Sequence, residues 1–177
     1  MNRSSNQYES FICHDFRGKD MFTYYEGFPT RYEFEETADP FNNYYQGNIY
    51  IYGDEPIPPW FHTGAGSVDW IAFNSAFNQP VSNLPRNVSR VEFGMNFNKK
   101  LRCLSKFDYI KYLEVGESFN KKLDHLPDCV EELVIRNADY RYNLNRLPKN
   151  LKKLVVHTVF EKNIILPEGC ILKRKVW

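Results

Sequence analysis

Apolar positions along the C-terminal two-thirds of the chain follow one short pattern several times. It reads apolar, two variable residues, apolar, one variable residue, apolar, and it occupies residues 88–93, 110–115, 130–135 and 151–156. Because side chains alternate along a strand, the second and third apolar residues of each run should point inwards and the residues beside them outwards. The pattern therefore predicts a series of short, similar strands that share one core.

The strands belong to a longer repeating unit. Three sets of equivalent positions recur every 19 to 22 residues: the aromatic set Phe77, Phe97, Phe119 and Tyr140, the leucine set Leu84, Leu104, Leu126, Leu147 and Leu166, and the strand set Ile71, Val91, Leu113, Leu133 and Leu154. A unit this short cannot bury its own apolar side, so successive units must stack. We predict a mainly β solenoid of about five coils of 20–22 residues, with a parallel sheet.

These residues resemble the FNIP repeat, a short relative of the leucine-rich repeat known mainly from slime moulds and from giant DNA viruses that infect amoebae. The resemblance rests on Phe77-Asn78-Gln79-Pro80-Val81, Leu84-Pro85, Val88, Val91, Phe93 and Gly94, and it covers about residues 68–172. The chain departs from the pattern at Ser105, at two extra residues before Ile110 and at Tyr140-Arg141. The resemblance implies a curved, right-handed, leucine-rich-repeat-like solenoid that takes part in protein interaction rather than catalysis.

The first part of the chain has a different composition. No leucine precedes Leu84, and aromatic runs around residues 21–27 and 31–36, separated by Gly27-Phe28-Pro29-Thr30, predict a β-hairpin. Residues 49–53 predict a third strand that already belongs to an irregular first coil. We predict an aromatic β cap over residues 1–60, continuous with a solenoid over 61–177, because the end of a solenoid needs covering. An interaction or homo-oligomerisation element is the alternative, and the leucine-rich helices of an F-box are not expected.

Stacking the strands in register predicts two outward columns. One is Trp70, Arg90, Tyr112, Glu132 and Lys153, and the other is Ala72, Glu92, Glu114, Val134 and Val155. Arg90 can stack between Trp70 and Tyr112, while Glu132 can pair with Lys153. One interpretation is a sheet surface that satisfies its own contacts. We prefer a docking face for a protein partner, since Trp, Tyr and Arg dominate interface hot spots.

Two carboxylates, Glu92 and Glu114, are expected on adjacent strands. A separation of about 5 Å matches the carboxylate pair of retaining glycosidases, so a hydrolase is an alternative function. Against it, an open sheet offers no cleft that would raise the pKa of one carboxyl for general acid work. We therefore predict a protein that is not an enzyme, with no cofactor and no metal site. Arg90, or a basic group on a partner, would neutralise the two carboxylates.

Lysines follow two of the Phe-Asn pairs, at Lys99, Lys100, Lys121 and Lys122. This basic ridge is explained most simply as a solvated edge, and its functional alternative is binding to nucleic acid or an anionic surface. A net charge of +1 argues against nucleic acid as the main partner.

Cysteine spacing and hydropathy indicate where in the cell the protein is expected. The four cysteines, at 13, 103, 129 and 170, lack metal-ligand spacing, so we predict free thiols. No apolar stretch approaches the ~20 residues that span a bilayer, and residues 1–8 lack a signal-peptide core. We expect a cytoplasmic protein without membrane contact, in the host cytoplasm if it is viral, whose partner is a protein such as a host factor.

Overall fold

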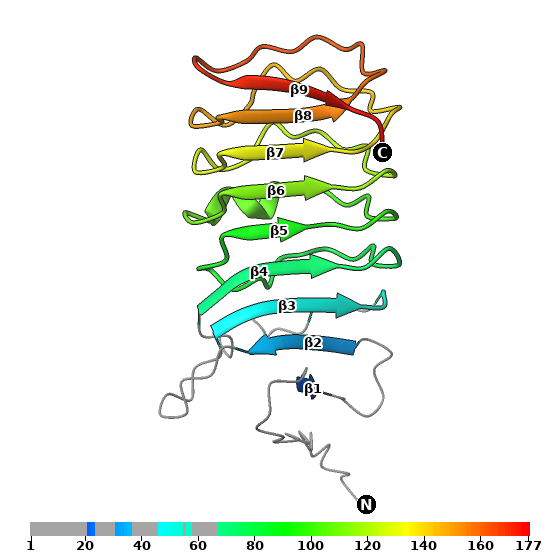
Figure 1. The fold of residues 1–177 in the computed structure, drawn as a ribbon, viewed down its shortest axis with the longest axis vertical. Helices are drawn as coiled ribbons and strands as arrows, with labels where there is room; N and C mark the ends of the chain where they lie inside the picture. The colour runs from blue at the N-terminus through cyan, green and yellow to red at the C-terminus, as the bar shows by residue number, and fades with distance from the viewer. Residues whose placement is uncertain (1–20, 24–30, 37–45, 55, 58–66) are drawn as a thin grey trace, which may run out of the picture.

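The computed structural model describes residues 21–23, 31–36, 46–54, 56–57 and 67–177, with side chains from residue 49 onwards. Within this part, nine strands form one sheet in sequence order: β1 (Met21–Thr23), β2 (Arg31–Glu36), β3 (Gln46–Tyr52), β4 (Ser67–Phe73), β5 (Arg90–Glu92), β6 (Tyr112–Val115), β7 (Glu132–Ile135), β8 (Lys153–His157) and β9 (Ile171–Lys175). β3 to β9 are parallel, and from β4 onwards each connection returns behind the sheet as a right-handed coil (Figure 1). The predicted solenoid is confirmed.

The parallel sheet is longer than the repeat pattern predicted. β3 pairs in parallel with β4, and Ile49 and Ile57 lie in the same core as the later coils. The prediction that residues 49–53 form a strand of an irregular first coil is therefore confirmed. β9 adds a further strand at the other end, so the seven parallel strands are joined by six connections, close to the five coils expected.

The N-terminal strands pair as the aromatic runs predicted. β1 is antiparallel to β2, and β2 is antiparallel to β3, with Phe34 opposite Ile49. Residues 24–30, which include the predicted turn, lie outside the described residues, as does Cys13. The division at residues 60 and 61 stays a prediction, because residues 58–66 are also outside this part.

An aromatic stack runs through the core along the solenoid axis. Phe97 lies between Phe77 and Phe119, with ring centroids 6.1 Å away on each side and nearly parallel planes. Tyr140 continues the stack at 6.2 Å from Phe119, and its buried hydroxyl donates a hydrogen bond to the carbonyl oxygen of Lys121. Burial raises the pKa of Tyr140 well above its usual range, so the hydroxyl keeps its proton.

Beside this stack, asparagine side chains link the coils through the backbone. The N–H of Asn98 donates to Oδ1 of Asn78, and the N–H of Asn120 donates to Oδ1 of Asn98, each at 2.9 Å. Asp54 accepts the first bond of this series, and the N–H of Arg141 makes the last. The asparagines thus tie the turns of successive coils together, and they are half-buried because the aromatic rings fill the interior.

The coil with two extra residues contains the one helical segment of the described part, the 3-10 helix η1 (Arg102–Lys106). The N–H of Leu104 bonds to the carbonyl of Leu101, and the N–H of Phe107 bonds to that of Leu104. Ser105 lies within this turn, where the repeat pattern has proline. The two extra residues are thus accommodated in the segment that connects β5 to β6, and the register of these two strands is unaffected.

Polar residues end the core at β9. Arg174 pairs with Val156 and so takes an inward position of the strand pattern, yet its guanidinium donates to the carbonyl oxygens of Thr158 and Phe160. Lys173 and Lys175 flank it on this edge strand, and charged edges resist pairing with another sheet. The last strand therefore combines the packing of Leu172 against the core with hydrogen bonds from Arg174.

Three of the cysteines, Cys103, Cys129 and Cys170, are free thiols, as predicted. Burial raises the pKa of each of the three, which favours the neutral form. Within the described ranges, no helix is long and apolar enough to span a bilayer. No group of three or more His, Cys, Asp or Glu residues could hold a metal ion there either.

Candidate functional site

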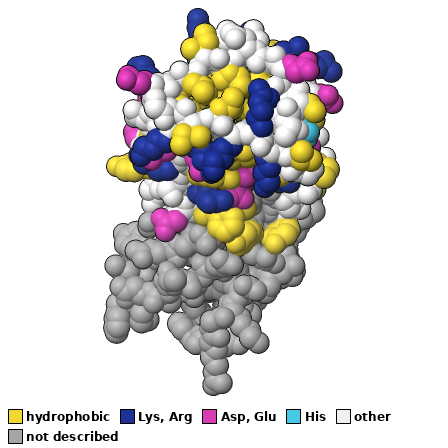
Figure 2. Space-filling view, turned by 45° about the horizontal axis from the view of Figure 1, so that its top comes forward, with side chains coloured by type: hydrophobic (Ala, Val, Ile, Leu, Met, Phe, Trp, Pro, Cys, Tyr) yellow, Lys and Arg dark blue, Asp and Glu magenta, His cyan; other side chains and the backbone are white. Residues whose placement is uncertain are grey.

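The outer face of the sheet carries both predicted columns in register. Trp70 pairs with Arg90, Arg90 with Tyr112, Tyr112 with Glu132 and Glu132 with Lys153. The second column follows in the same way from Ala72 to Val155. All seven predicted site residues therefore lie on one continuous surface, where basic, acidic and apolar side chains are interspersed (Figure 2). Whether this surface binds a partner stays a prediction at this point.

Arg90 occupies the centre of an aromatic sandwich. Its guanidinium carbon lies 5.3 Å from the centroid of the Trp70 ring and 3.9 Å from that of Tyr112. Nε of Arg90 also donates to Oε1 of Glu92 at 2.5 Å, while the side chain keeps 45% of its surface exposed. Nε1 of Trp70 is buried without a hydrogen-bond partner among the described residues, and the ring meets Tyr50 edge-on. The stacking is as predicted.

Glu114 has partners that the sequence pattern did not supply. It accepts a hydrogen bond from the hydroxyl of Tyr112, and Arg136 approaches its Oε1 at 3.3 Å. A second nitrogen of Arg136 lies 3.1 Å from Glu117. Desolvation and the hydrogen bond to Glu114 raise the pKa of Tyr112 well above its usual range. The tyrosine therefore remains a neutral donor at any physiological pH.

These contacts answer the question of the paired carboxylates. Glu92 and Glu114 do lie opposite each other on β5 and β6, but Arg90 neutralises the first and Arg136 the second. Of the two cations, only Arg90 was anticipated. Because each carboxylate is paired with its own arginine, the two do not form the free acid and base pair of a glycosidase. The arrangement is therefore a poor match to a hydrolase site.

A further column flanks the face at the start of the strands. Glu131 forms ion pairs with Lys111 at 3.0 Å and with Lys152 at 2.6 Å. These lysines occupy the equivalent positions in the preceding and the following coil. Opposite charges on neighbouring strands attract each other, and this alternation of sign helps to fix the register of the strands. The hydrogen bonds from Lys152 and Lys111 hold the pKa of Glu131 below its usual range.

The lowered pKa of Glu131 predicts how the stability of the fold changes in acid. A carboxyl whose pKa is lower in the folded state stabilises the fold above its unfolded pKa, near 4.5, and stops doing so as the pH falls through the folded value. We expect Glu131→Gln to lower the free energy of unfolding at pH 7, with the difference from wild type shrinking as the pH falls below 4.5. Urea unfolding at a series of pH values from neutral downwards measures this. Glu161→Gln, at an exposed residue without an ion pair to the described residues, is the control; an acid-sensitive loss there too would contradict the assignment.

The face is hollowed over β6 to β9. A depression of about 320 Å³ is lined by four of the predicted site residues, Tyr112, Glu114, Glu132 and Lys153. Glu132 and Lys153 form the predicted ion pair along one side. Sequence alone suggested an open, flat sheet at this point. The hollow is therefore a correction, and it includes Glu114 but not Glu92.

The hollow owes its shape to the C-terminal residues. Val134 and Val155 form an apolar floor and are only 5% and 7% exposed, although both point outwards. Trp177 makes a wall, with its ring centroid 5.9 Å from the guanidinium carbon of Arg136 and 6.0 Å from the His157 ring. Figure 1 shows the chain after β9 turning back past the ends of β8 and β7. No repeat signal could place this tail.

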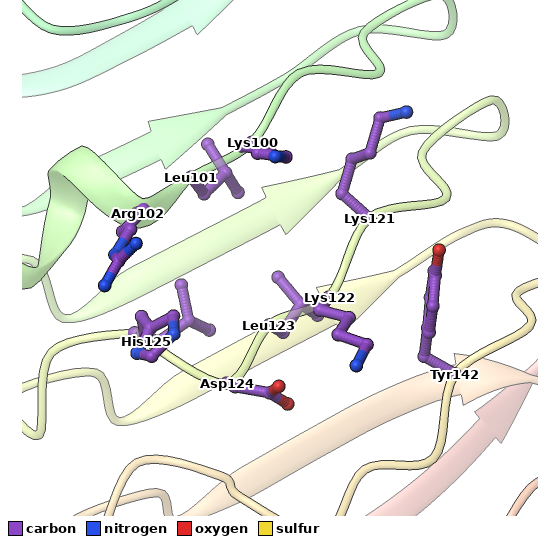
Figure 3. A pocket seen from close by; sticks show the side chains of 10 residues that line it. Lys100, Leu101, Arg102, Lys121, Lys122, Leu123, Asp124, His125 and Tyr142 are labelled. Carbon is purple, nitrogen blue, oxygen red and sulfur yellow. The ribbon is translucent and has the colours of Figure 1, made fainter.

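The basic ridge lies away from this surface, on the return segments of the coils. Lys100, Lys121 and Lys122 line a separate pocket there together with Arg102, whereas Lys99 does not line it (Figure 3). None of these side chains forms an ion pair with a described residue. The sequence thus located a basic region correctly but did not reveal its concave shape.

The chain was also compared with known proteins. Protein-family models, curated proteins and solved structures all return no match. The features that bear on function are therefore those of the solenoid itself, whose outer sheet face carries an arginine sandwich and an apolar-floored hollow.

Proposed function

We propose that this protein is a non-enzymatic repeat module that binds a protein partner through the outer face of its sheet, over β4 to β9. Its affiliation with FNIP-repeat proteins is part of the same proposal and rests on the repeat residues alone. The observation that carries the binding proposal is the hollow, in which Val134 and Val155 form an apolar floor inside a rim of charged groups.

This arrangement has the anatomy of a protein interface. Interfaces combine an apolar centre with a polar rim and are enriched in aromatic residues and arginine. Here the Arg90 sandwich continues the surface beyond the hollow, through Tyr112, which belongs to both. Because most of these side chains are already held by stacking and ion pairs, a partner would immobilise few of them, and the entropic cost of binding falls accordingly.

The test is affinity capture from an extract of the native cell, with wild type beside the double variant Trp70→Ala/Tyr112→Ala. We expect a partner that stays bound to the wild-type protein at high salt and is lost from the double variant. Each aromatic anchor removed at an interface centre costs about 2 kcal/mol or more. Thermal melting followed by circular dichroism checks that the variant is folded.

A matched control changes the opposite side of the molecule. Lys99→Ala/Lys106→Ala alters two basic residues on the return segments and leaves the sheet face intact. Capture that survives in the double aromatic variant, or that is lost equally in this control, would remove the sheet face as the binding surface. The hydrolase alternative would be supported only if the wild-type protein turned over a substrate and Glu92→Gln abolished that activity.

A further inference from the structure

Four cations that form no ion pair with a described residue line the pocket on the return segments (Figure 3). Lys100 and Arg102 come from one coil, and Lys121 and Lys122 come from the next. Asp124 is the one carboxylate in the lining, so these five residues give a formal net charge of +3. Four cations around one concavity repel each other, and a bound anion would relieve that repulsion.

The sheet face provides the contrast. There, Arg90, Arg136 and Lys153 each lie within 3.3 Å of a carboxylate oxygen. Lys100 and Lys122, by comparison, form no ion pair with a described residue. Lys173 and Lys175, on the edge strand β9 of the sheet face, also form no ion pair with a described residue, so the contrast holds for the centre of that face. Exposed cations are often only solubilising, but the four cations of the pocket surround a hollow instead of being spread over a ridge.

The shape of the pocket limits the anion that fits. Its volume is about 290 Å³, close to the lower end of small-molecule sites. Leu101 and Leu123, which are 2% and 3% exposed, form its floor. A site of this size and polarity suits a compact ligand that has a strongly charged part and an apolar part.

The cations that line the pocket come from two coils only. The positions equivalent to Lys100 and Lys122 are Pro80 in the preceding coil and Asn143 in the following one. Adjacent rungs of a sheet are about 4.8 Å apart. A track this short does not follow a polynucleotide, which needs a positive groove along several nucleotides.

One aromatic ring completes the pocket. Tyr142 comes from the third coil, at the position equivalent to Lys121, and its ring centroid lies 5.9 Å from Nζ of Lys122. It meets Tyr140 edge-on at 5.8 Å, which fixes its orientation. A ring held beside a cluster of cations can stack against a nucleobase while the cations contact phosphate oxygens.

From these observations we infer that the pocket is a binding site for a compact diphosphate ester of nucleoside diphosphate size. Lys100, Arg102, Lys121 and Lys122 contact the phosphates, and Tyr142 contacts the base. The site is independent of the sheet face, so its test does not depend on the protein partner.

The experiment is isothermal titration of the whole protein with pyrophosphate and with ADP at low ionic strength. We expect both to bind, ADP more tightly. Lys100→Gln/Lys122→Gln should weaken both ligands by about tenfold or more, since charge-assisted hydrogen bonds are lost. Tyr142→Ala should abolish the preference for ADP while leaving pyrophosphate binding nearly unchanged. All substitutions are at exposed or half-buried positions, and thermal melting verifies their folding.

Lys99→Gln is the matched control, because it removes a neighbouring positive charge that does not line the pocket. Its effect on pyrophosphate should stay below about twofold, the change expected of a screened surface charge. The inference is overturned if neither ligand binds at millimolar concentration or if Lys99→Gln weakens binding as much as the pocket variant. It is also overturned if single-stranded oligonucleotides bind more tightly than ADP with an affinity that grows with their length, which would indicate a polynucleotide surface.

Discussion

Replacing Phe97 with alanine is expected to lower the free energy of unfolding by about 3–5 kcal/mol. The ring is fully buried, stacks between Phe77 and Phe119, and lies 3.9 Å from the Phe93 ring by centroid distance. Its removal would leave a cavity at the contact between coils, where each repeat depends on its neighbours. Because a domain of this size is stable by only about 5–15 kcal/mol, part of the population could unfold at room temperature.

Chemical denaturation followed by circular dichroism measures this loss. The matched control is Tyr109→Ala, which removes an aromatic ring that is 61% exposed and should change stability by about 0.5 kcal/mol or less. An unchanged midpoint for Phe97→Ala, or an equal shift in the two variants, would mean that the aromatic stack does not hold the coils together.

The second large effect is expected at Gly116. A Cβ atom at this position would lie closer than 3.0 Å to the carbonyl group of Gly94, which belongs to the backbone of the preceding coil. A carbonyl within a stacked turn cannot move aside as a flexible side chain could. We expect Gly116→Ala to cost about 2–3 kcal/mol through overpacking of the two turns.

The same denaturation experiment provides the comparison. Ser118→Ala alters an exposed residue of the same turn and adds no atom, so it should be nearly neutral. A Gly116→Ala protein as stable as wild type would show that the turns are farther apart than this structure has them. Gly94 should behave like Gly116, since its Cβ would meet the backbone of Asn74 and Ser75.

Most of the fold could be predicted because the repeat constrains it. Once Val91 and Leu113 are equivalent, alternation along the strands fixes which residues point outwards. The two outer columns and the sandwich of Arg90 therefore followed from registration alone. The last strand, β9, was harder to predict, because Arg174 stands at an inward position where the pattern expects an apolar residue.

The parts of the site that were missed have physical reasons. Arg136 follows the last residue of β7 and reaches Glu114 diagonally on the adjacent strand β6. The predicted columns compare only residues that lie directly opposite each other. Reading two residues beyond Val134 on the same side of β7 could have found it. The place of Trp177 had no such signal, because a segment outside the repeat has no equivalent residue in another coil.

The central claim is that equivalent residues of successive coils lie side by side, which methyl-resolved nuclear Overhauser spectroscopy tests directly. The structure requires cross-peaks between Val91 and Leu113, between Leu113 and Leu133, and between Leu133 and Leu154, as neighbours in a parallel sheet. Observing this chain of contacts between residues 20 to 22 positions apart would support the stacked coils and the outer face built on them. Assigned methyl groups with no cross-peaks between these pairs would contradict both.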